Sequence, residues 1–106
     1  MVLGAGFAGL EAAYALARLG KKVTVIEKFS QILPNQLDLP GSKIIHDDLT
    51  KSGVAIILNA SVSTIHGNTT VEYVTLTDHS MIKADMVVIA TGTRPNKELA
   101  SEAGLT

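Results

Sequence analysis

Three glycines near the start of the chain, followed at a distance by an acid, have the spacing of a loop that binds phosphates and a ribose. Gly4, Gly6 and Gly9 follow a short apolar run at Met1 to Leu3 and open a segment with helical periodicity. Gly4 permits a tight turn, Gly6 lets a pyrophosphate approach the backbone, and Gly9 permits close packing of helix and strand. Glu27 lies 18 residues after Gly9, near the position expected for an acid that binds ribose hydroxyls.

The residues between these glycines complete the candidate phosphate-binding loop. They are Ala5, Phe7 and Ala8. Unpaired N–H groups at the start of the helix, together with the positive end of its dipole, would face two linked phosphates. Glycines at a strand-to-helix turn can also be turn chemistry alone. The order of strand, glycines, helix, second strand and acid favours dinucleotide binding.

The elements around this loop predict a parallel β-α-β unit. Apolar residues from Ala8 to Leu19 recur at helical spacing, and Gly20 follows where a left-handed cap residue belongs. The β-branched segment from Lys21 to Glu27 predicts a strand covered on both faces. The apolar run at Met1 to Leu3 is short for a buried strand, so we expect the chain to begin inside its first strand and to be a piece of a longer protein.

A second helix is expected after the ribose-binding acid. Asp38 can cap it, and Pro40 is tolerated in its first turn. Ile45 and Leu49 are expected on its buried side, and Gly53 ends it.

The second half of the chain predicts strands up to Asn96 and the start of a polar helix in the tail from Lys97 to Thr106. The expected strands are 54–58, 62–65, 71–76, 81–83 and 86–90, with turns at Gly67-Asn68 and at Asp78. The middle three form a small antiparallel meander that replaces a helix as the crossover. We therefore predict an α/β, Rossmann-like three-layer fold with a central parallel sheet, helices and an antiparallel β-meander crossover.

Composition narrows the possible functions. The 106 residues are 46% hydrophobic and 18% charged with a net charge of −1, typical of one globular domain without a basic surface for nucleic acid or an anionic membrane. The absence of cysteine excludes disulfides and thiol chemistry in this chain. His46, His66 and His79 lack metal-ligand spacing, so no metal site is predicted, and no nucleophile and base form a catalytic pair. No segment is long enough to span a membrane, and a cytoplasmic origin is expected.

Longer stretches of the sequence resemble a known family. The run GAGFAGLEAAYALARLGKKVTVIEK, the segment Ile32 to Pro34, the meander and the run ATGTRPN at Ala90 to Asn96 are similar to the NAD domain of the pyridine nucleotide-disulfide oxidoreductases. The resemblance implies an NAD-binding domain at residues 1–96, inserted into an FAD domain to which residues 97–106 begin to return. It also implies that the parent enzyme is an FAD-dependent NADH oxidoreductase and a homodimer, and that this chain alone is inactive.

The resemblance implies roles for further residues. Phe7 occupies an aromatic position beside the nicotinamide pocket, and Glu11 matches an acid that faces the nicotinamide end. Glu11 can equally be a carboxylate that stabilises the first helical turn. Thr91 and Gly92 match a loop that approaches the dinucleotide at a strand's carboxyl end. Val62 matches a position whose backbone meets the adenine, although a place in the core explains it as well.

Charge predicts which cofactor is preferred. A carboxylate at Glu27 would repel the 2′-phosphate of NADPH and accept hydrogen bonds from a free ribose, so NADH is expected to bind more tightly. Lys28 could accommodate a phosphate, or it could be a solvated surface charge. Two alternatives stay open: an FAD-binding domain of the same superfamily, and a nucleotide-binding module without catalysis.

Overall fold

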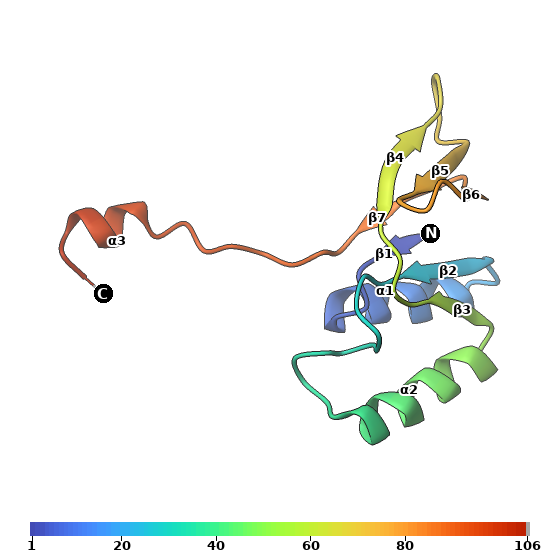
Figure 1. The fold of residues 1–106 in the computed structure, drawn as a ribbon, viewed down its shortest axis with the longest axis horizontal. Coiled ribbons are helices and arrows are strands. Elements are labelled where there is room, and N and C mark those ends of the chain that lie inside the picture. Colours follow the sequence, from blue (N-terminus) through green and yellow to red (C-terminus); the bar gives the residue numbers. More distant parts are fainter. Residues whose placement is uncertain (106) are drawn as a thin grey trace.

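Two β-sheets and two long helices make up the body of the computed structural model, which describes residues 1–105 (Figure 1). Thr106, the end of the predicted returning segment, lies outside the described residues. The parallel sheet has the order β3-β2-β1-β7, with strands β1 (Val2–Leu3), β2 (Val23–Ile26), β3 (Val54–Ile57) and β7 (Val88–Ile89). The antiparallel sheet has the order β4-β5-β6, with strands β4 (Val62–His66), β5 (Tyr73–Leu76) and β6 (Met81–Lys83).

The parallel sheet is the middle of three layers, as the sequence predicts. Helices lie on one face and the meander on the other (Figure 1). Alternate residues of β1 and β2 divide between these faces: Val2 and Val25 belong to the core beneath the helices, whereas Leu3 and Ile26 pack with Val74 of the meander. Both faces of the central strands are therefore covered by apolar side chains, which is what a parallel sheet requires.

Helix α1 (Phe7–Arg18) connects β1 to β2 and buries a narrow stripe. Its buried residues are Gly9, Leu10 and Ala13, spaced as one face of a helix. Gly20, with a φ of 74°, turns the chain out of the helix into β2. The predicted helix is confirmed, displaced by one residue at each end.

Helix α2 (Leu39–Lys51) begins at the predicted cap, since Asp38 Oδ1 accepts a hydrogen bond from Gly41 N at 3.0 Å. Its buried residues are Ser42 and Leu49. The expectation that Ile45 is buried is wrong, because its side chain is 38% exposed. Strand β3, on which α2 packs, is at the edge of the sheet. The helix therefore has only a narrow surface to cover, and the residues one turn either side of Ile45 occupy it.

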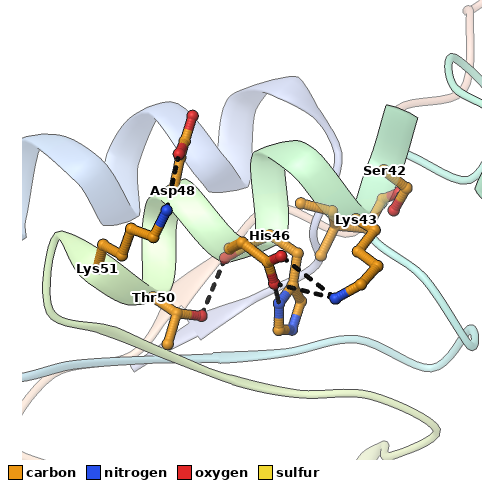
Figure 2. Close-up of polar contacts among 8 residues, drawn as sticks. Ser42, Lys43, His46, Asp48, Thr50 and Lys51 are labelled. Carbon is orange, nitrogen blue, oxygen red and sulfur yellow. Dashed lines mark hydrogen bonds and ion pairs between the residues drawn. The ribbon is translucent and has the colours of Figure 1, made fainter. Parts of the chain in front are cut away.

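Polar side chains make contacts along α2, as Figure 2 shows. Lys43 Nζ lies 3.2 Å from Asp47 Oδ2, His46 Nδ1 lies 3.7 Å from the other oxygen of Asp47, and Thr50 Oγ1 donates to the carbonyl of His46 at 2.9 Å. The hydrogen bond from Lys43 is the main reason that the pKa of Asp47 is lowered. Across residues 1–105, no group of three or more metal-ligating side chains occurs.

Strand β7 is shorter than predicted. It covers two residues rather than 86–90, and it pairs only with β1, through Val88 N to Met1 O and Ala90 N to Leu3 O. Met86 is 59% and Ile89 66% exposed. These side chains are exposed because β7 ends the order of the sheet and has one neighbour.

Beyond β7 the chain leaves the body of the molecule. It runs as an extended segment to the short helix α3 (Glu98–Glu102), which has no buried residue (Figure 1). The radius of gyration, 16.0 Å, exceeds the value of about 13 Å typical of a compact domain of this size because of this arm. Of the helices in the described part of the chain, none is long and apolar enough to cross a membrane.

Candidate functional site

A cleft of about 900 Å³ opens where β1, β2 and β7 end at their carboxyl sides. This size is typical of sites for small molecules and cofactors. From β1 the chain adds β2 and β3 on one side, and then returns through the meander to add β7 on the other side of β1, so the strand order reverses at β1. Ligands of open α/β sheets bind at such a switch point, outside the carboxyl ends of the strands.

The cleft brings together most of the residues proposed from sequence. Those that line it are Gly4, Gly6, Phe7, Ala8, Glu27, Lys28, Val62, Thr91 and Gly92. Ala5, Gly9 and Glu11 do not line it. Ala5 and Gly9 lie between or beside lining residues and support the loop from behind.

Gly4 and Gly9 are needed for packing within the protein. Gly4 has a φ of 102°, and a Cβ there would overlap the carbonyl oxygen of Ala90, at the end of the neighbouring strand. A Cβ on Gly9 would overlap the carbonyl oxygen of Gly4. The first turn of α1 therefore lies directly against the loop, as predicted for the first and third glycines of this pattern.

Gly6 differs from Gly4 and Gly9 in its surroundings. Its φ is −79° and its ψ is −175°, a conformation open to any residue, and an added Cβ would meet nothing within 4 Å. The space in front of it is the cleft. Sterically the fold does not require glycine here, and its absence of a side chain leaves the cleft in front of the loop open to the close approach of a ligand.

Backbone N–H groups at the start of α1 lie beside Gly6. The first hydrogen bond of α1 runs from Leu10 N to Gly6 O at 3.0 Å, so the N–H groups of Phe7, Ala8 and Gly9 precede the helical ladder. Within residues 1–105, no side chain caps this end of the helix. These donors and the helix dipole suit an anion in the cleft.

The peptide groups of Ala5 are engaged on both sides. Its N–H donates to Glu27 Oε2 at 2.7 Å, and its carbonyl accepts from Leu33 N at 2.8 Å. Leu33 has a φ of 47°, unusual for a non-glycine residue, and this conformation points its N–H at the loop. The sequence did not predict this hydrogen bond between Leu33 and Ala5. Its only sign was the segment Ile32 to Pro34, which gave no indication of which residue it contacts.

Glu27 ends β2 as a nearly buried acid, 6% exposed. Oε2 accepts from Ala5 N, and Oε1 accepts from Phe29 N at 2.9 Å. Among the described residues, no basic side chain forms an ion pair with it. An ionised carboxylate has about four acceptor positions. Two are used within the protein, and the remaining two can accept ribose hydroxyls.

The end of the cleft near β3 has an aromatic and a cationic side chain. Lys28 Nζ lies 4.8 Å from the centre of the Phe29 ring, and both residues line the cleft. Val62 also lines it while packing against the core under the meander, so it fits both interpretations given from sequence.

The opposite end, near β7, is more apolar. Phe7 and Ile89 line it and are 61% and 66% exposed, beside Thr91 and Gly92.

Because α1 begins at Phe7, Glu11 is in the second helical turn, and the interpretation of Glu11 as a first-turn carboxylate is wrong. Its role at the nicotinamide end stays a prediction.

The layers, the strand order and the glycine loop define a Rossmann-like α/β domain. The chain belongs to the pyridine nucleotide-disulphide oxidoreductase family, which it matches over residues 1–106.

Known members of the family are much longer than this chain. An NADH oxidase from Methanocaldococcus jannaschii is 43% identical over 103 residues, which are 97% of this chain and 23% of that protein. The structure of a ferredoxin reductase for the CYP199A2 system from Rhodopseudomonas palustris superposes with a TM-score of 0.93 and 31% identity, covering 99% of this chain and 26% of that one. The structure of an NAD-dependent persulfide reductase from A. fulgidus superposes with a TM-score of 0.87 and 39% identity, covering 99% of this chain and 19% of that one.

Proposed function

We propose that this chain binds NAD(H) in the cleft at the carboxyl ends of β1, β2 and β7. In a longer flavoenzyme it would position NADH for hydride transfer to FAD. The observation that carries the proposal is Gly6, which faces open space beside a row of unpartnered amides although the fold does not need glycine there. A bound pyrophosphate explains it, because a side chain would stand between the phosphates and their donors. Residues 1–96 are the proposed binding domain, and 97–106 begin the return to the FAD domain.

The residues fit a dinucleotide from end to end. The N–H groups of Phe7 and Ala8, which line the cleft, would hold the pyrophosphate, and Glu27 would accept hydrogen bonds from the adenosine ribose. The adenosine would then lie toward β3, near Val62 and Phe29. That leaves the nicotinamide toward β7.

The β7 end of the cleft suits a flat ring that reacts with a second ring. Phe7 and Ile89 are largely exposed there and would exclude water from a stacked partner. The hydride chemistry belongs to the two cofactors, and this chain supplies position and electrostatics. Thr91 and Gly92 would border the nicotinamide, with Gly92 at a φ of 109° that favours glycine.

NADH is proposed as the preferred cofactor because Glu27 would repel a 2′-phosphate. The names of the NADH oxidase and the persulfide reductase describe NADH- or NAD-dependent proteins and agree with it. A homodimeric parent and a cytoplasmic location stay predictions.

Titration of the purified chain tests the proposal. NADH, NADPH and FAD are added in parallel while binding is followed by calorimetry. We expect saturable binding of NADH, weaker binding of NADPH, and no NADH oxidation by this chain alone. A yellow protein that retains FAD and ignores NADH would instead identify an FAD-binding domain. NADH turnover without added flavoprotein would contradict the proposed division of labour.

A further inference from the structure

Glu27 is placed to do more than bind a ribose. Its carboxylate is nearly buried, and each oxygen already accepts a backbone hydrogen bond, from Ala5 N at 2.7 Å and from Phe29 N at 2.9 Å. A buried charge is stable only where hydrogen bonds replace the lost water. These two bonds fix the acid to both the phosphate-binding loop and the turn after β2.

The residue that Glu27 holds is next to the phosphate donors. Ala5 immediately precedes Gly6, the N-cap of α1. Its N–H is held by Glu27 and its carbonyl by Leu33 N at 2.8 Å, while Gly4 N donates to Ile26 O at 2.8 Å. The Ala5 N–H is therefore not available to a phosphate, and its orientation sets where the next peptide groups point.

We propose that Glu27 is a positioning residue for the phosphate-binding amides as well as the acceptor for the ribose. This inference rests on the proposed function. It adds that the same carboxylate serves two parts of the cofactor: through one oxygen it orders the loop that receives the pyrophosphate, and through its free acceptor positions it meets the sugar. Replacing Glu27 should then weaken binding even of a ligand that has no ribose hydroxyls to offer.

The substitution that isolates this role is Glu27→Gln. Glutamine has nearly the same shape, but its amide nitrogen is a donor and cannot accept from a backbone N–H. One of the two buried contacts must break. Glu72→Gln is the matched control, since Glu72 is an exposed acid at the meander and outside the cleft.

The ligand pair is NADH and an analogue of NADH whose adenosine ribose lacks both the 2′- and the 3′-hydroxyl. Dissociation constants of both are measured for the wild-type chain and the two variants. We expect Glu27→Gln to weaken binding of the dideoxy analogue about tenfold, because a loop that holds its binding conformation for only part of the time lowers the apparent affinity by that fraction. Glu72→Gln should bind it like the wild type.

Spectroscopy of the protein without nucleotide gives an independent readout. In Glu27→Gln the amide proton of Ala5 or of Phe29, whichever faces the new side-chain nitrogen, should move upfield and exchange faster, and neither should change in Glu72→Gln. Circular dichroism and thermal unfolding verify the fold. If Glu27→Gln does not fold, the same measurements are made on Glu27→Asp, which keeps the charge but is too short to reach both amides.

These measurements distinguish failure of the positioning role from failure of the proposed NAD(H) binding. Equal affinity of the wild type and Glu27→Gln for the dideoxy analogue, with unchanged Ala5 and Phe29 amides, would overturn the positioning role alone, because Glu27 would then act only on the sugar. Absence of NADH binding by the wild type would overturn the proposed function, and the positioning role with it.

Discussion

Replacing Gly6 by alanine separates binding from folding more cleanly than any other change in the loop. Its backbone angles suit alanine, and the new methyl group would project into the cleft without meeting another atom within 4 Å. The fold should therefore tolerate Gly6→Ala. The pyrophosphate should not, because the methyl group stands where the phosphates must approach the amides of Phe7 and Ala8.

Gly6→Ala should change the stability of the protein little and its affinity for NADH strongly. Alanine lowers the entropy of the unfolded chain, which raises the free energy of unfolding by about 0.4–1 kcal/mol. As an N-cap, alanine is poorer than glycine, which lowers the free energy of unfolding by a similar amount. The free energy of unfolding should change by less than about 1 kcal/mol. For binding, displacing the phosphates costs at least one charge-assisted hydrogen bond of about 1.5–3 kcal/mol, so the Kd for NADH should rise about tenfold or more.

Gly9→Ala is the comparison for stability, because here the fold itself should be affected. Its Cβ would overlap the carbonyl oxygen of Gly4, so the loop or helix must shift at a cost of about 1–3 kcal/mol, partly offset by the better helix propensity of alanine. Thermal unfolding should show Gly9→Ala melting lower, by about 4–8 °C for each kcal/mol lost. Unchanged NADH affinity in a folded Gly6→Ala protein would refute the reasoning about the cleft.

Three smaller predictions follow from other contacts. Asp38→Ala removes the bond to Gly41 N and should lower the unfolding free energy by about 1 kcal/mol in urea titrations, whereas Asp38→Ser should restore most of it. Lys28→Ala should weaken NADPH about threefold in calorimetry and leave NADH unchanged, since an exposed ammonium contributes little; equal effects on both cofactors would count against a role at the 2′-phosphate. Lys43→Ala should raise the pKa of Asp47 toward its ordinary value of 3.8 in an NMR titration. The stability from this pair is present at neutral pH and is lost as the pH falls through the lowered pKa, so the variant should be less sensitive to acid between the two values.

The order of the elements around the loop was predictable because local signals agree. The spacing of Leu10 and Ala13, the cap at Gly20 and the β-branched run after it all indicate one β-α-β unit. The fold needs these residues to cover the central strands on both faces, and that demand is visible in the sequence. Asp38 was predictable for a similar reason, since a cap is a contact between near neighbours.

Features that depend on position within the sheet were not predictable. The apolar run at 86–90 has the composition of a buried strand, but β7 is at the edge, and only the strand order shows this. Ile45 has the spacing of a buried residue on a helix that covers too little surface to bury it. The role of Glu27 was half visible: its distance from Gly9 indicated the ribose, whereas its bond to Ala5 depends on how two loops meet in space.

The most direct measurement is an NMR titration of the 15N-labelled 106-residue chain with NADH. The account predicts that the largest shifts occur at the amides of Gly6, Phe7 and Ala8, with smaller shifts around Glu27 and at Thr91. The amides of α2 should not move. Binding that shifts α2 or the meander and leaves Gly6 to Gly9 unchanged would contradict a pyrophosphate held at the start of α1.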